Sequence, residues 1–163
     1  MNDGRMEKIG GYVSAVSLLA ALGCVFLPLL KTATIEGEEI LFYGWRLLFG
    51  GREDALLSSG VYSFSFSTNI YLLVATQTFL LAAVSCFLGK QSVFNRIFSI
   101  VLAIAGIVLL SLSPIWVSKT SSLPRNSLNM AYGYVLSSCL AFAAVLIEVF
   151  LLVLAFAKRK KRA

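Results

Sequence analysis

Four long apolar runs constrain the fold of this chain more than any other feature. They lie near residues 9–30, 70–89, 97–117 and 133–157. A helix needs roughly 20 residues to cross a hydrocarbon core of about 30 Å, and each run has about that length. Only 13% of the 163 residues are charged, against about 25% in soluble domains. We therefore expect one integral membrane domain of the all-α class, an antiparallel bundle of four transmembrane helices.

The first run has two interpretations, because a basic stretch followed by an apolar one is also typical of a signal peptide. Arg5 and Lys8 precede the run. Its apolar part is longer than the 7–15 residues of a signal peptide, and no A-x-A cleavage site follows it. We expect a retained transmembrane helix.

The distribution of Lys and Arg predicts the orientation in the membrane. Residues 1–8, 90–96 and 158–163 carry nine positive charges in 21 positions, whereas residues 31–69 and 118–132 carry five in 54. Positive flanks stay in the cytoplasm, so both termini are predicted there. The basic tail is expected to meet lipid headgroups through Lys158, Arg159, Lys160, Lys161 and Arg162. The absence of an N-x-S/T acceptor agrees with a bacterial cytoplasmic membrane.

Small residues recur at steps of three and four in all four runs, which marks the faces where helices meet in lipid. The four stripes are Gly10, Ser14, Ser17, Ala21 and Cys24; Ala75, Thr78, Ala82, Ser85 and Gly89; Ser99, Ala103, Gly106 and Ser113, interrupted by Leu110; and Ser137, Ala141 and Ala144. Glu148 continues the last stripe. Its carboxylate is therefore predicted to point into the bundle, about 13 Å from the cytoplasmic end.

Glu148 has two possible roles. It could be a protonated structural group that donates to a serine or a carbonyl, or that pairs with a partner protein. It could instead bind protons or cations in a transport path. Ser17 is expected at a similar depth and Ser14 nearer the cytoplasm, so both join the predicted intramembrane polar site. No other charge and no His is expected in the four helices.

The loop of residues 31–69 is long enough to form a small antiparallel sheet outside the membrane. Residues 32–45 predict a hairpin that turns at Glu36 and Gly37. Residues 61–69 alternate between aromatic residues and serine, which predicts a half-buried strand. Residues 52–59 are expected to form a helical turn. The aromatic face of Tyr62, Phe64 and Phe66 is expected to pack on the fold, a ligand platform being the alternative. The predicted outer-loop interaction residues are Trp45, Tyr62, Phe64, Phe66 and Arg125.

The charges of the two outer loops predict a contact between them. Residues 31–69 have a net charge of −2 and residues 118–132 a net charge of +2. We expect Arg125 to pair with one of the acids of the long loop. A cation site at the sequence EGEE is the alternative, but its ligand spacing is not of the EF-hand type.

The arrangement of four helices, inside termini, a long sheet-forming first loop and a shorter second loop resembles that of claudin-like membrane proteins. Of their W-GLW-C-C loop signature this chain has only Gly44 and Trp45. The resemblance covers the topology of the whole chain and implies a scaffold or accessory role.

The functional residue types argue against catalysis. The chain has no His, and Cys24, Cys86 and Cys139 all fall within predicted helices, so no general base or nucleophile is recognisable. No metal site and no cofactor is predicted. We expect a non-enzymatic membrane subunit that binds another membrane protein or itself; the alternative is a small oligomeric transporter or channel with Glu148 as its proton or cation site.

Overall fold

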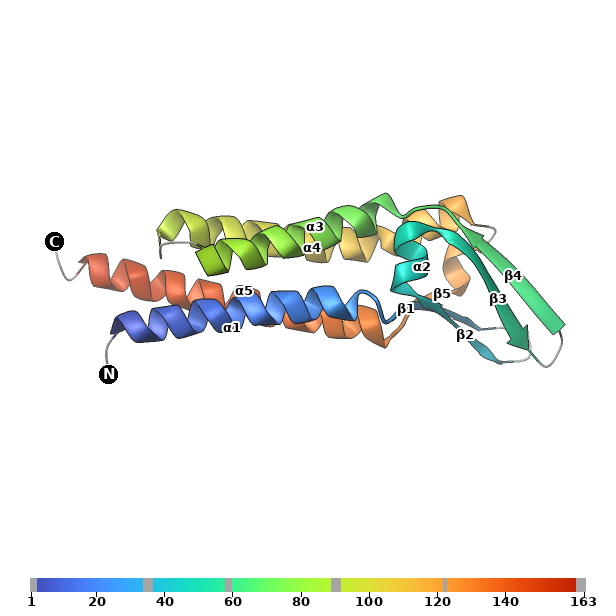
Figure 1. Ribbon diagram of the computed structural model, residues 1–163, viewed down its shortest axis with the longest axis horizontal. Helices are drawn as coiled ribbons and strands as arrows, with labels where there is room; N and C mark the ends of the chain where they lie inside the picture. The colour runs from blue at the N-terminus through green and yellow to red at the C-terminus, as the bar shows by residue number, and fades with distance from the viewer. Residues whose placement is uncertain (1–2, 34–36, 58–59, 89–91, 122, 161–163) are drawn as a thin grey trace.

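The computed structural model describes residues 3–33, 37–57, 60–88, 92–121 and 123–160. Over these ranges, four long helices lie side by side: α1 (Asp3–Cys24), α3 (Ile70–Leu88), α4 (Val93–Thr120) and α5 (Tyr132–Lys160). All the strands gather at the end of the helices that lies away from the two termini (Figure 1). The chain is mostly helical, with a small β region at one end.

Three of these helices are long and apolar enough to cross a membrane. The candidate spans are Ile70–Phe87, Val93–Thr120 and Tyr132–Ala157. Helix α1 is not among them, since its first two turns carry charged residues such as Arg5 and Lys8. The three apolar helices fit a membrane protein.

The bounds predicted for the first helix are wrong at both ends. The first helix was expected over residues 9–30, but α1 begins at Asp3 and ends at Cys24, and strand β1 (Pro28–Ala33) follows. Helix α4 contains the third predicted span, residues 97–117, and extends four residues before it and three after it. Hydropathy detects only apolar segments, so it misses the polar turns at the start of α1 and does not separate the apolar strand β1 from the helix.

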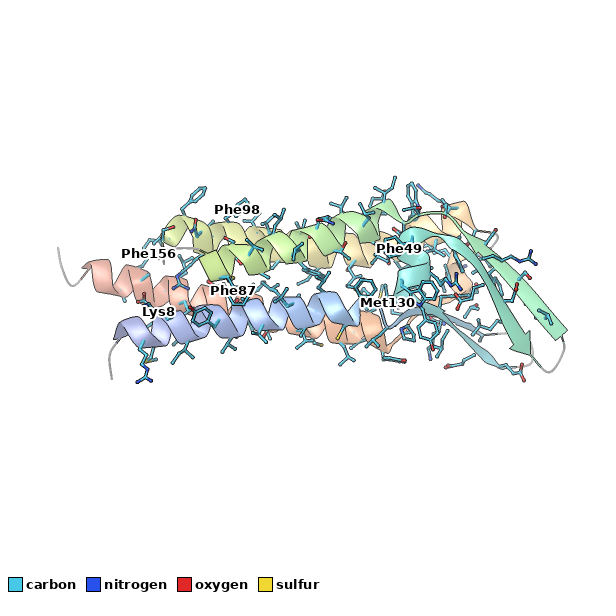
Figure 2. The ribbon with its side chains drawn as sticks, in the orientation of Figure 1. Lys8, Phe49, Phe87, Phe98, Met130 and Phe156 are labelled. Carbon is cyan, nitrogen blue, oxygen red and sulfur yellow. The ribbon has the colours of Figure 1, made fainter. Side chains whose placement is uncertain are left out.

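The small-residue stripes are where the helices pack. Helix α4 buries every third or fourth residue, including Ser99, Ala103, Gly106 and Leu110, and α5 buries Ser137, Ala141 and Ala144. A Cβ built on Gly106 would lie 2.5 Å from the ring of Phe79 on α3, so glycine permits this close approach. Large apolar residues on the other faces point outward, as Phe98 does (Figure 2).

The first sheet has the order β2–β1–β5 and is antiparallel throughout. Strand β1 pairs with β2 (Glu39–Tyr43), as the predicted hairpin requires, and Gly37 has the positive φ of 83° that favours glycine in turns. Residues 34–36, which include the predicted turn residue Glu36, lie outside the described ranges. Strand β5 (Leu128–Met130) comes from the segment between α4 and α5, so this segment and the one between α1 and α3 are joined by a sheet.

The second sheet is the hairpin of β3 (Gly51–Leu57) and β4 (Gly60–Phe66), in continuous register. Strand β4 confirms the strand predicted from the alternating residues. The helical turn predicted for residues 52–59 is wrong, because most of that segment is β3. A short helix lies earlier instead, as α2 (Gly44–Phe49).

An aromatic cluster joins the two sheets. The ring of Phe42 on β2 is fully buried, and the rings of Phe64 and Phe66 on β4 meet it edge-on at 5.3 Å and 5.1 Å. Asn69 anchors this region to the helices, since its side chain caps α3 at the amide of Leu72 and donates to the carbonyl of Ser113 on α4.

Candidate functional site: a buried ion pair in a polar pocket

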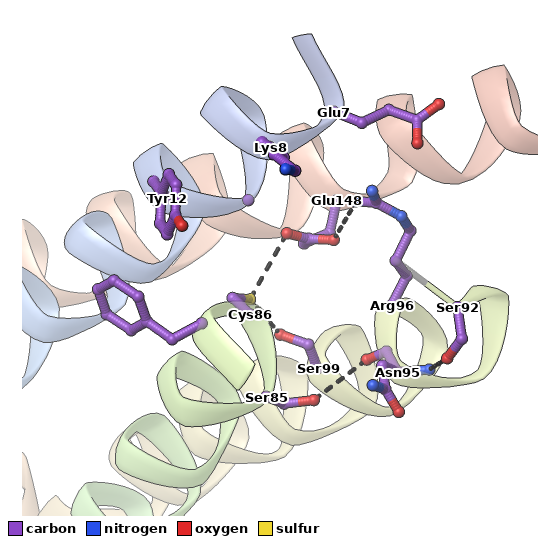
Figure 3. Close-up of a pocket in the computed structure, with 12 residues that line it drawn as sticks. Glu7, Lys8, Tyr12, Ser85, Cys86, Ser92, Asn95, Arg96, Ser99 and Glu148 are labelled. Carbon is purple, nitrogen blue, oxygen red and sulfur yellow. Dashed lines mark hydrogen bonds and ion pairs between the residues drawn. The ribbon is translucent and has the colours of Figure 1, made fainter. Parts of the chain in front are cut away.

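A polar pocket lies at the end of the helices that is opposite to the sheets. Its volume is about 390 Å³. All four long helices contribute to its lining (Figure 3). Its charged residues are Glu7 and Lys8 on α1, Arg96 on α4 and Glu148 on α5. Uncharged polar groups from α3 and α4 complete the wall, among them Ser85, Cys86, Ser92, Asn95 and Ser99.

An ion pair forms the inner wall of this pocket. Nη1 of Arg96 donates to Oε2 of Glu148 at 3.0 Å, and the two residues are only 6% and 3% exposed. Two opposite charges at this distance attract strongly where water is scarce. Nε of Arg96 is buried and has no hydrogen-bond partner among the described residues.

A hydrogen-bonded chain links Glu148 to the other helices. Sγ of Cys86 donates to Oε1 of Glu148 at 3.5 Å and lies 3.0 Å from Oγ of Ser99. Ser99 donates to the carbonyl of Ala82, and Ser14 on α1 lies 3.7 Å from the same sulfur. Cys86 therefore sits between three polar side chains, each from a different helix.

The helix stripes and the unequal lengths of the helices explain why the two charges meet. Arg96 lies three residues before Ser99, so it extends the buried stripe of α4 toward the helix start. Glu148 extends the stripe of α5 but lies 12 residues before the end at Lys160 (160 − 148), roughly 18 Å at 1.5 Å per residue. Helices α1 and α5 thus extend together past the end of α3 and α4, with Gly10 against Leu151.

The partner of Glu148 corrects two expectations. The helices do hold a further charge, because Arg96, assigned to a cytoplasmic flank, is a buried residue of α4. In the first of its two predicted roles Glu148 donates to a serine or a backbone carbonyl, whereas in the structure its carboxylate accepts hydrogen bonds from Arg96 and Cys86. The spacing from Arg96 to Ser99 is the sequence signal that could have found the pair.

The predicted serines lie differently from each other. Ser14 is fully buried and donates to the carbonyl of Ala144 at 3.3 Å. It reaches Glu148 only through Cys86. Ser17 is half-buried one turn farther from the pocket, and neither serine belongs to the pocket lining.

The predicted outer-loop residues lie in different surroundings. Phe64 and Phe66 pack on Phe42, as expected of a packing face, whereas Tyr62, on the same strand, is exposed. Trp45 is partly exposed on α2, with the guanidinium of Arg46 3.9 Å from its ring centroid.

Arg125 is exposed in the 3-10 turn Arg125–Ser127. The ion pairs found in the described parts of the outer loops are Lys31–Glu39 at 2.6 Å and Arg52–Asp54 at 3.2 Å. Strands β1 and β5 join the two loops by backbone pairing. The predicted pairing of Arg125 with an acid of the long loop stays a prediction.

Two neighbouring acids of β3 have opposite pKa shifts. Burial raises the pKa of Glu53 above its ordinary value, although the charge of nearby Arg46 opposes the shift. A hydrogen bond from Ser63, and then Arg52, lower the pKa of Asp54. Among the described residues, no three His, Cys, Asp or Glu cluster so that they could hold a metal ion. The predicted EGEE site includes Glu36, which is outside these residues.

The side chains of the basic tail also lie outside the described part of the chain. Helix α5 continues to Lys160, so the tail begins within a helix. The predicted headgroup contacts of Lys158, Arg159, Lys160, Lys161 and Arg162 stay predictions.

Comparison of the chain with protein-family models, with curated proteins and with solved structures found no match. The resemblance to claudin-like proteins stays a prediction from topology.

Proposed function

We propose that this chain is a non-enzymatic integral membrane subunit that binds another membrane protein, or a second copy of itself, through its β region. It would cross the membrane four times with both termini in the cytoplasm. Helices α3, α4 and α5 supply three crossings. The polar first turns of α1 would lie at the interface, with its apolar part in lipid.

The outward face of α1 supports a fourth crossing. Its large apolar residues Val13, Val16 and Leu19 are exposed, although the same helix packs closely on α5. Lipid is the environment that accepts such a face without cost.

The observation that carries the binding role is the β3–β4 hairpin, which extends away from the helices at the sheet end (Figure 1). Val61 and Tyr62 are 64% and 45% exposed at its outer part, whereas Phe66 at its base is buried. The base therefore fixes the hairpin to the fold and the outer part presents apolar and aromatic groups. Tyrosine is enriched where proteins bind each other.

Site-specific photocrosslinking in cells tests this role. A benzophenone side chain at position 62 should capture one membrane protein, or a second copy of this chain, in a band of fixed size. The same group at position 66, buried on the same strand, is the matched control and should capture nothing. Equal labelling at both positions, or none at position 62, would contradict the proposal.

Transport is the second candidate function, and the pocket with Glu148 favours it. Between the pocket and the sheets, however, the helices are packed by fully buried residues such as Ala15, Phe79 and Leu110, which leaves little room for a path through one copy. A Glu148→Gln variant that is folded, still bound to its partner and inactive in proton flux into liposomes would favour transport over the subunit role.

A further inference from the structure

We propose that the polar pocket binds a phosphate ester, the headgroup of a membrane phospholipid being the source that fits best. This goes beyond the proposed subunit role and does not depend on the β region. Four observations support it: an incompletely bonded arginine, a helix start, a balanced set of charges and aromatic residues in the pocket wall.

Arg96 is the central residue of this site. A guanidinium has five N–H donors in a planar fork, and this fork matches phosphate oxygens. Glu148 engages Nη1 alone, while Nε has no partner in the described residues. The side chain is 94% buried (100 − 6) and belongs to the pocket lining. The cost of a buried donor without a partner would be removed by an anionic oxygen at this position.

The start of α4 adds a favourable field. Helix α4 has 28 residues, and its first turn carries Asn95 and Arg96 into the pocket wall. The amides of Asn95 and Arg96 are already bonded to Ser92, so the contribution of this helix start is its dipole, which favours negative charge. Ser92 accepts from the amide of Asn95 at 3.2 Å and so holds this turn in place.

The charges of the pocket fit a phospholipid better than a highly charged ligand. Lys8 and Arg96 contribute two positive charges, and Glu7 and Glu148 two negative charges. Figure 3 shows Lys8 and Arg96 reaching toward Glu148 from opposite sides. Such a balanced set suits a phosphodiester that also carries an ammonium group, as in phosphatidylethanolamine.

The pocket wall and its level agree with an amphiphile. Tyr12 and Phe87 lie on α1 and α3, with ring centroids 5.8 Å apart, and both are more than 40% exposed. They can contact the upper part of acyl chains while the phosphate lies among the polar groups. The pocket lies at the end of α3 and α4, next to the polar first turns of α1. If α3 and α4 span the bilayer, this end lies at the level of the lipid headgroups.

Native mass spectrometry of the purified, delipidated full chain tests the site. Phosphatidylethanolamine is added and its retention compared with that of diacylglycerol, which has the same chains and no phosphate. We expect one retained phosphatidylethanolamine and at least tenfold lower retention of diacylglycerol. Lys8→Gln, which changes an exposed residue of α1, should lower phosphatidylethanolamine retention about tenfold. Arg125→Gln removes the same charge at the other end and should leave it unchanged.

The double variant Arg96→Met with Glu148→Leu provides a second measurement, since removing both charges avoids leaving one of them buried alone. It should fold and lose the retained lipid. Competition with inorganic phosphate identifies the source: displacement at equal concentration assigns the site to free phosphate, and none assigns it to a phospholipid. Equal retention of diacylglycerol, or full retention of phosphatidylethanolamine by both folded pocket variants, would overturn the phosphate site.

Discussion

The two ends of the molecule use an ion pair in opposite settings. At the pocket end, Nη1 of Arg96 lies 3.0 Å from Oε2 of Glu148, and both residues are almost fully buried. At the sheet end, Lys31 and Glu39 are closer, at 2.6 Å, but their side chains are 34% and 57% exposed. The shorter contact is expected to matter less, because water screens it and the long side chains lose entropy when they are held together.

The comparison shows that the environment of a charge decides its energetic weight. An exposed pair can be broken and each partner is hydrated. A buried pair can be broken only by leaving the other charge without solvent, which costs about 3–5 kcal/mol. Replacing both buried charges by apolar residues is often neutral or stabilising, so the pair need not be there for stability.

The largest predicted effect comes from breaking the buried pair. Arg96→Met should destabilise the protein by about 3–5 kcal/mol, since Glu148 then lacks its charged partner. Glu148→Leu should cost a similar amount. The measurement is unfolding of the purified protein by SDS in mixed micelles, followed by circular dichroism.

The double variant is the control for this prediction. If Arg96→Met and Glu148→Leu together recover most of the stability lost in each single variant, the pair acts as a unit. Additive losses would mean that each residue acts through other contacts, and the contrast between the two ends would then fail. Glu148→Gln should fall between the wild type and Glu148→Leu, because an amide oxygen still accepts from Arg96.

The next effect concerns the aromatic cluster at the sheet end. Phe66→Ser should lower stability by about 1.5–3 kcal/mol, the value of one large buried side chain. Tyr62→Ser, on the same strand and face, should have little effect because Tyr62 is exposed. Thermal unfolding monitored by size-exclusion chromatography compares the two. Equal losses would show that the outer part of the hairpin is packed as well.

The polar pocket could be predicted in part from the sequence. Glu148 follows Ala144 at the helical spacing, so its inward direction was predictable from its own helix. The partner was missed because Arg96 lies at the start of α4, where a positive charge was assigned to the cytoplasmic flank. To predict that Arg96 and Glu148 meet, one must know how far α4 and α5 are offset along their axes. No local sequence pattern encodes that offset.

The β region shows a similar limit. The alternation of Tyr62, Phe64 and Phe66 with serines was enough to predict strand β4, because an aromatic residue at every second position is typical of a β-strand. Residues 52–57 carry helix-forming Glu, Ala and Leu, and only their pairing with β4 makes them a strand. Strand β5 has three residues, and its pairing with β1 across about 100 positions leaves no signal in either segment.

A smaller predicted effect is the pH dependence of stability that two acids at the sheet end, Glu53 and Asp54, cause in opposite directions. Burial raises the pKa of Glu53, so the folded state binds this proton more tightly than the unfolded chain. The stability that the protonated carboxyl contributes is present below its ordinary pKa and is lost as pH rises through the raised value. Glu53→Gln should therefore raise the melting temperature at about pH 8 and not at about pH 4.

The neighbouring residue Asp54 should change stability with pH in the opposite direction to Glu53. The pKa of Asp54 is lowered in the folded state. The stability that its carboxylate contributes is therefore present above the ordinary pKa and is lost as pH falls through the lowered pKa. Asp54→Asn should lower the melting temperature slightly at neutral pH and have no effect in strong acid. A loss of stability in Glu53→Gln at about pH 8 would contradict the prediction for Glu53, since it would mean that this carboxylate is hydrated or paired in the folded state.

The smallest effect tests the other side of the comparison, the exposed pair of strands β1 and β2. Lys31→Ala removes the 2.6 Å contact with Glu39 and should cost about 0.2–1 kcal/mol, because both partners remain hydrated. Salt should reduce even this difference, since screening acts on exposed charges over a Debye length of about 10 Å at 0.1 M. The same salt titration should leave the loss in Arg96→Met nearly constant, because the buried pair is shielded from solvent ions. Unfolding of both variants at low and high salt therefore measures the two ends under identical conditions. A Lys31→Ala loss as large and as salt-independent as that of Arg96→Met would show that burial is not what distinguishes them.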